Sequence, residues 1–274
     1  MVDLFFQVVL LGAFTLIYDN LAFFYLPVNV FTVLLCILGF DFLFYWAHRW
    51  SHEINFWWGA HVVHHSSEEF NLSVALRQSW FHNVLAFFIF IPLPLLGFDP
   101  MAFLIAGSIH TLYQFWIHTK TIDRMPAWFE AVFNTPSHHR VHHGVNPKYI
   151  DRNHAGVLII WDKLFGTFQA EEEEVVYGIT TPLKSWNPVW ANLHYYVEMF
   201  KASKAMKWAD KLRMIFAKPG WRPDYMGGTI PIPEPSSDRE VYDANAVNKW
   251  LNLYVLVQFF LILAGLVVFM YFFR

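Results

Sequence analysis

Long apolar runs that end beside clusters of histidine are the feature that most constrains the fold of this chain. Eight histidines form one HxxxH and two HxxHH motifs, namely His48 and His52, then His61, His64 and His65, then His139, His142 and His143. His118 stands alone at the end of another apolar run. Neutral imidazole is the commonest side-chain ligand of transition metals. Eight motif histidines are too many for one ion, so the sequence predicts two.

Five apolar segments predict helices that lie in a membrane. They cover residues 4–18, 28–47, 80–98, 100–118 and 251–273. A helix needs about 20 apolar residues to cross a bilayer, so 4–18 is either a short span or an interfacial helix. Only 15% of residues are charged, against roughly 25% in average soluble domains. We therefore predict an all-α integral membrane protein with a single membrane domain, in which 80–118 forms a helical hairpin.

The basic residues predict the orientation of this domain. None of the 19 lysines and arginines lies in residues 1–48 or 78–119, whereas sixteen lie in 120–249. The hairpin then places the basic segments and the histidines on one side, which the positive-inside rule makes cytoplasmic. We expect a multi-pass protein of a bacterial inner membrane or the endoplasmic reticulum, with the histidines in a cytoplasmic helical cap. The net charge of −3 gives no reason to expect a nucleic-acid partner.

Helical periodicity predicts how the histidines divide between two ions. Positions i, i+3 and i+4 share one face of a helix, whereas adjacent residues such as His64 and His65 diverge by about 100°. An adjacent pair can therefore serve two neighbouring ions. Four or five imidazoles per ion favour a redox metal, and iron above all, over structural zinc, which often uses cysteine. Cys36 is the chain's only cysteine. Zinc would still bind such a site in place of iron.

Several polar positions lie outside the motifs. Asp41, seven residues before His48 on the same helical face, either orients a ligand imidazole or packs helices together. Within an amphipathic and linker region, 186–250, residues 201–217 predict one helix, on anionic lipid or simply solvated. Its lysines are Lys201, Lys204, Lys207 and Lys211. Residues 229–240, with three prolines, predict a connector. The histidines taken as non-ligands are His82, His110, His154 and His194.

The histidine motifs resemble the fatty acid hydroxylase and sterol desaturase superfamily of membrane di-iron enzymes. The likeness covers about residues 38–185, which we expect to be the di-iron hydroxylase core. Its ether-cleaving subfamily, the alkylglycerol monooxygenases, is similar to HRWSHE (48–53), HHSSEEFNLSVALRQS (64–79), LYQFWIHT (112–119), NTPSHHRVHHG (134–144) and AGVLIIWDKLFGTF (155–168).

The resemblance also implies the ligands. One iron would take His48, His52, His61, His65 and His142, and the other would take His64, His118, His139 and His143. Gln114 would reach metal through water, and Glu53 would support a ligand or face a pterin. His138, next to a motif histidine, is expected behind the ligands. No catalytic residue beyond the ligands is expected.

The reaction implied by the resemblance is hydroxylation, with dioxygen, of the carbon beside an ether oxygen in a lipid substrate. The product collapses to a fatty aldehyde and glycerol. Tetrahydrobiopterin supplies electrons in the animal enzymes, but the flanks carry no recognisable pterin signature, so the electron donor is open. Two alternatives stay open: a hydroxylase or desaturase of a fatty acyl chain, sterol or carotenoid, and a non-catalytic membrane metal-binding protein.

Overall fold

The computed structural model describes residues 2–235 and 249–272, where all regular elements are helical. The helices are α1 (Val2–Leu21), α2 (Val30–Glu53), α3 (Asn55–Trp58), α4 (Val62–His65), α5 (Leu72–Ala75), α6 (His82–Phe90), α7 (Pro92–Leu95), α8 (Pro100–Trp116), α9 (Ala127–Glu130), α10 (Pro136–His142), α11 (Ile160–Phe165), α12 (Pro188–Ser203), α13 (Trp208–Phe216), η1 (Asp224–Met226) and α14 (Lys249–Phe272). The chain forms two units, Met1–Ser236 and Ser237–Arg274.

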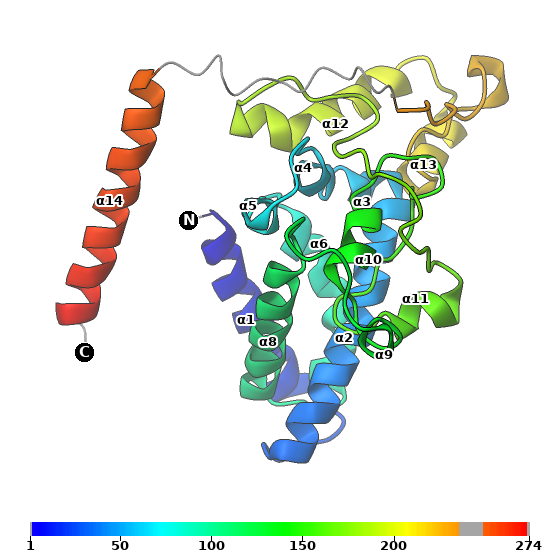
Figure 1. The fold of residues 1–274 in the computed structure, drawn as a ribbon. Coiled ribbons are helices and arrows are strands. Elements are labelled where there is room, and N and C mark those ends of the chain that lie inside the picture. The colour runs from blue at the N-terminus through cyan, green and yellow to red at the C-terminus, as the bar shows by residue number, and fades with distance from the viewer. Residues whose placement is uncertain (1, 236–248, 273–274) are drawn as a thin grey trace. The chain divides into compact units, whose positions relative to one another are not determined.

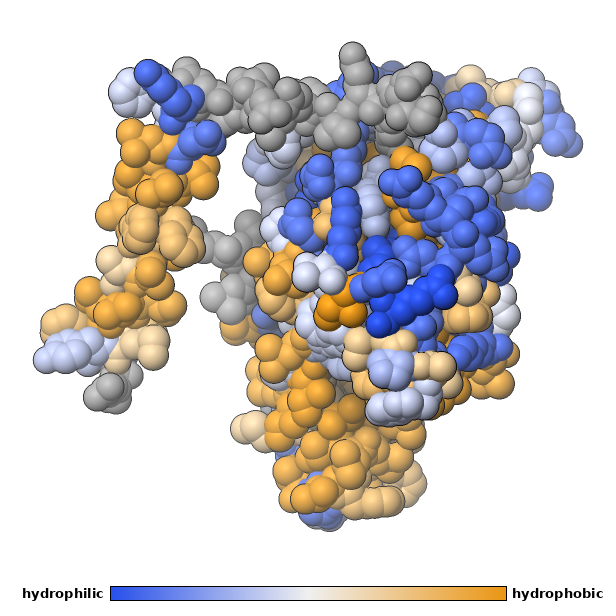
Figure 2. All heavy atoms as spheres, in the orientation of Figure 1, coloured by the Kyte–Doolittle hydropathy of each residue, from blue (hydrophilic) through white to orange (hydrophobic). Residues whose placement is uncertain are grey.

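The first unit is built on a bundle of its longest apolar helices (Figure 1). α2 packs on α8 and α6, and α1 packs on α6, α7 and α8. The buried core of this bundle includes Phe14, Cys36, Phe90 and Ala106. The segment expected to form a helical hairpin consists of α6, α7 and α8, and both α6 and α8 pack on α2. Figure 2 shows apolar side chains over the end of this unit where α1 meets α2, and hydrophilic ones toward the other end.

Two turns close the apolar end of the bundle. Gly97 has a φ of +89°, which favours glycine, and a Cβ there would lie 2.0 Å from the Phe24 carbonyl oxygen. The Leu26 amide donates to the Gly97 carbonyl at 3.0 Å, and the Phe23 amide donates to the Leu95 carbonyl at 2.8 Å. The turn between α7 and α8 is thus bonded to the turn between α1 and α2.

Two described helices are long and apolar enough to cross a membrane, Val30–Glu53 and Asn252–Phe272. α2 starts at an Asn29 capping box and continues six residues past the expected segment, so its last two turns carry His48 and His52. Shorter apolar helices cover Phe5–Leu21 and His82–Leu95. Together the helices suggest membrane association.

The single amphipathic helix expected over 201–217 is wrong. α12 ends at Ser203, and α13 begins only at Trp208, after the extended backbone of Lys207. Between them the Met206 side chain is buried, which turns the chain inward. Lys201 and Lys211 therefore belong to different helices. Residues 229–235 of the expected connector have no regular structure, and 236–240 lie outside the described residues.

Candidate metal centre

Nine histidines come together where α2 ends, in two buried groups. The ligand nitrogens of each group all lie within 4.8 Å of one another. One group holds His48, His52, His61, His65 and His142, and the other holds His64, His118, His139 and His143. These memberships are the same as the two ligand sets implied by the resemblance. We call them the five-histidine and four-histidine groups.

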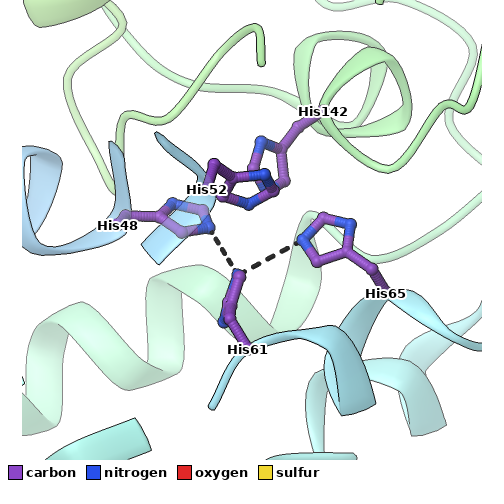
Figure 3. A group of neighbouring side chains, drawn as sticks. All are labelled: His48, His52, His61, His65 and His142. Carbon is purple, nitrogen blue, oxygen red and sulfur yellow. Dashed lines mark hydrogen bonds between the residues drawn. The ribbon is translucent and has the colours of Figure 1, made fainter. Parts of the chain in front are cut away.

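In the five-histidine group the imidazoles face a common space (Figure 3). His61 Nε2 lies 3.0 Å from His48 Nε2 and 3.2 Å from His65 Nε2. Nitrogens bound to one ion at about 2.1 Å stand about 3.0–3.4 Å apart when their bond angles are roughly 90–110°. His52 Nε2 and His142 Nε2 are buried without a hydrogen-bond partner. The spacing and the free nitrogens both fit a metal ion.

In the four-histidine group, the hydrogen bonds of His64 and His118 indicate a cation site. His118 Nδ1 lies 2.7 Å from the Gln114 carbonyl oxygen, and His64 Nδ1 lies 3.2 Å from that of Arg77. A carbonyl only accepts, so each Nδ1 carries the proton and each Nε2 a lone pair. The two Nε2 atoms are 3.3 Å apart. Two buried lone pairs facing each other repel unless a cation lies between them.

A proton shared between the two Nε2 atoms cannot take the place of that cation, because these histidines are not protonated near neutral pH. Burial first, and the nearby imidazoles second, hold the pKa of His64 and of His139 well below the usual histidine value. Burial also lowers the pKa of His118, the other partner in that contact, to about 4. These rings are therefore neutral near pH 7, which is the state that binds metal.

Short turns, rather than long helices, present the HxxHH motifs. α4 is a single turn with His61 as its N-cap, and α10 starts at Pro136 after the Thr135 cap and ends before His143. One helical turn is enough for the adjacent residues to diverge. His64 and His65 accordingly enter different groups, and so do His142 and His143. This division of the adjacent pairs is the one that the angular argument from sequence predicts.

Asp41 does not orient a ligand imidazole. Its buried carboxylate accepts hydrogen bonds from the Val157 and Leu158 amides at 2.7 and 3.1 Å and from Trp161 Nε1 at 2.9 Å. It also lies 3.2 Å from His110 Nε2. The alternative interpretation, a packing role, is the one the structure favours, because Asp41 joins α2 to α8 and to the segment before α11.

The other expected supporting residues lie near the site in different ways. Glu53 pairs with Arg49 at 3.2 Å and with Lys218 at 3.7 Å, and no hydrogen bond to the nine histidines is seen. Gln114 Nε2 is buried and without a partner, so it is free to bond water. His138 is buried against the edge of Phe168 and belongs to neither group.

The four histidines expected not to be ligands, His82, His110, His154 and His194, lie outside both groups. His110 pairs with Asp41, and His194 Nδ1 lies 2.9 Å from the Ala191 carbonyl. His82 packs against His61, with 4.9 Å between ring centroids. His154 is fully buried, with 5.1 Å between its ring centroid and that of His52.

A cavity of about 860 Å³ opens onto both groups. His52, His65, His142 and His143 form one wall. α12 and α13 also line the cavity, and they pack on α4 and α3, respectively. The apolar lining includes Trp58, Val145, Ile179, Met199, Met206 and Met214. Charged residues also line it, namely Asp151, Glu198, Lys218 and Arg222.

Comparison with known families agrees with this centre. The family described as fatty acid hydroxylase matches residues 33–167, which contain all nine histidines. The chain belongs to the fatty acid hydroxylase family. No solved structure matches it.

Relatives in this family extend the likeness over nearly the whole chain. The alkylglycerol monooxygenase of Homo sapiens is 42% identical over 96% of this chain, and that of Danio rerio is 41% identical over 92%. The protein of the same name from Xenopus tropicalis is 39% identical over 96% of the chain. This chain spans 59%, 57% and 59% of these three relatives.

Sequence reasoning missed the residues that fix the backbone behind the five-histidine group. Residues 152–158 run beside the five-histidine group without regular structure, and Asp162 and Asn134 bond to their backbone. One signal was present. Asp162 is a lone acid within the apolar run AGVLIIWDKLFGTF, where a carboxylate is costly unless bonded.

Proposed function

We propose that this protein is a membrane di-iron monooxygenase that cleaves an alkylglycerol ether. The observation that carries the proposal is the pair of Nε2 lone pairs, His64 and His118, facing each other at 3.3 Å in a buried site. That arrangement requires a cation. The relatives named alkylglycerol monooxygenase then indicate the reaction and the lipid class.

The nine histidines would bind two iron ions, five ligands to one and four to the other. Bound iron would supply the activation of dioxygen. The free Gln114 amide would bind a water molecule on the four-histidine side. The protein's own task is then to hold an alkyl chain with the carbon beside the ether oxygen close to both groups. Zinc would fit the same nitrogens, so zinc found in purified protein would not identify the native metal.

The cavity supports a lipid as substrate. Its volume of about 860 Å³ lies within the range of about 300–1,000 Å³ typical of small-molecule sites. Methionines and Trp58 give it an apolar surface that adapts to a flexible chain. The charged residues that also line it suit the hydroxyl groups of a glycerol. The tetrahydrobiopterin implied by the resemblance is a candidate electron donor, and the assay below includes it.

We also propose a multi-pass arrangement with the metal centre on the cytoplasmic face. The turns at 22–29 and 96–99 lie at the apolar end of the first unit, whereas His48 and His52 lie at the opposite end of α2. The absence of lysine and arginine in 1–48 and 78–119 favours an orientation with that apolar end away from the cytoplasm.

The test is an assay of iron-loaded protein in detergent with an alkylglycerol, dioxygen and a reduced pterin. We expect a fatty aldehyde from the ether and none from a monoacylglycerol of the same chain length. His142→Ala should abolish the product, whereas His194→Ala, outside the groups, should keep most of it. A stable hydroxylated or desaturated lipid would instead indicate the second class of enzyme. No iron-dependent oxygen consumption with any lipid would indicate a metal-binding protein without catalysis.

A further inference from the structure

The segment 152–158 bonds to two ligands of the five-histidine group through its backbone. His48 Nδ1 donates to the His154 carbonyl at 2.8 Å, and His142 Nδ1 donates to the Arg152 carbonyl at 2.9 Å. A bond at Nδ1 fixes the ring tautomer and leaves Nε2 for the metal. The orientations of the His48 and His142 rings therefore depend on the positions of these two carbonyl groups.

Asp162 holds the peptide group between residues 154 and 155. The Ala155 amide donates to one carboxylate oxygen at 2.8 Å, and the His154 amide donates to the other, also at 2.8 Å. The peptide whose N–H bonds Asp162 is the one whose C=O accepts from His48. Carboxylate, peptide and imidazole thus form one continuous hydrogen-bonded chain, in which each bond polarises the next.

Other backbone groups of the segment 152–158 are also hydrogen-bonded. Asn134 Nδ2 donates to the Ala155 carbonyl at 2.6 Å, and the Asn153 amide donates to the Thr167 carbonyl at 3.1 Å. Thr167 Oγ1 in turn donates to Asp162 at 2.6 Å. Asn153 has a φ of +53°, a conformation that asparagine adopts more readily than most residues. The fully buried Asp162 is thus the charged centre of this network.

In the four-histidine group, the Nδ1 atoms of His64 and His118 bond to carbonyls outside the segment 152–158. These carbonyls belong to Arg77 and Gln114, on other parts of the chain. No hydrogen bond among the described residues links Asp162 to either of them. A change at Asp162 should therefore act on one metal and leave the other.

We infer that Asp162 is a positioning residue for the five-histidine metal site, acting through the 154–155 peptide on His48. The inference rests on the proposed function, since it presupposes that the groups bind metal. In many metal sites a carboxylate bonds directly to the ligand histidine and fixes the orientation of its ring. Here Asp162 would fix the orientation of His48 indirectly, through the intervening peptide group.

Metal affinity measured one site at a time tests the inference. The parent variants are His139→Ala, which leaves the five-histidine site, and His61→Ala, which leaves the four-histidine site. Cobalt(II) affinity is measured by chelator competition in detergent, with and without Asp162→Asn. We expect Asp162→Asn to weaken the five-histidine site by about 10- to 100-fold, the usual effect of losing an outer hydrogen-bond partner, and to change the other site less than threefold.

The outcomes separate the inference from the function on which it rests. Equal weakening at both sites would mean a general structural role for Asp162, and no weakening would mean no role; either overturns the inference alone. Parent variants that bind no cobalt would overturn the proposed function as well. Should Asp162→Asn fail to yield folded protein, Thr167→Val removes one donor to the carboxylate. It should give the same selective loss with a smaller factor, and equal loss at both sites would again overturn the inference.

Discussion

The rings of His65 and His143 stack with 4.3 Å between their centroids and 20° between their planes, although they belong to different groups. Rings stacked this closely are in direct contact in a close-packed interior. The two metal sites therefore share a wall made of ligands, and they are direct neighbours rather than separate centres.

We predict two metal ions per chain. Elemental analysis of iron-supplemented protein should give two ions for the unaltered chain and for His194→Ala. His61→Ala and His139→Ala should each give one, because each removes a ligand from a different group. One ion or fewer in the unaltered chain would contradict the prediction.

Acid should destabilise the metal-free protein. A histidine has a pKa of about 6.5 in an unfolded chain, whereas burial lowers that of His142 to about 4. Between these values the unfolded chain binds more protons, so stability is full above pH 6.5 and falls as the pH drops toward 4. One such ring contributes on the order of 3 kcal/mol.

The measurement is thermal unfolding of metal-free protein in detergent at several pH values from 7.5 down to 4.5. His142→Phe, which has no titrating group there, should show a shallower fall. A midpoint that stays constant below pH 6.5 would argue against buried neutral histidines.

Gly156→Ala should destabilise the first unit. A Cβ at Gly156 would lie 2.0 Å from His110 Nε2 and 2.9 Å from Asp41 Oδ1, and both side chains are buried. Overpacking of this kind costs about 1–3 kcal/mol or more. The control is Gly12→Ala in α1, where, apart from the adjacent backbone of α1 itself, no atom of the described residues lies within 4 Å of the added carbon. A melting temperature that drops equally in both variants would contradict this account.

Ala202→Phe should shorten the alkyl chains that the enzyme accepts. Ala202 lines the cavity, and a benzyl side chain would occupy space needed by the end of a long chain. We expect kcat/KM for a C18 alkylglycerol to fall at least tenfold, with a smaller loss for C12. Ala205→Phe is the matched control, because Ala205 is exposed and does not line the cavity. If kcat/KM falls by the same factor for both chain lengths, Ala202 does not limit the length of the alkyl chain.

Labelling of single cysteines tests the topology. In a Cys36→Ser background, Leu96→Cys lies in the turn at the apolar end and Lys204→Cys lies after α12. A membrane-impermeant maleimide added to intact cells should reach position 96 only, and position 204 only after permeabilisation. The reverse pattern would place the metal centre on the outer face.

Local regularities made part of this structure predictable from sequence. The apolar segments became helices because length and hydropathy act locally. His64 and His65 could be assigned to different groups because adjacent helical residues diverge within a single turn. The break between α12 and α13 depends instead on burial of Met206, and the partners of Asp41 come from residues more than 60 positions away. Such contacts follow from tertiary packing, which periodicity does not encode.

The length of α8 has a consequence for the surrounding lipid. Its 17 residues make a rod about 26 Å long, whereas the hydrocarbon layer of a typical bilayer is about 30 Å thick. The turn before α8 bonds its backbone to the turn before α2, so it does not depend on water there. In the proposed arrangement, this hydrophobic mismatch thins the bilayer around the bundle. Headgroups next to the protein then lie closer to the cap than they do elsewhere, which shortens the path of a lipid leaving the membrane for the cavity.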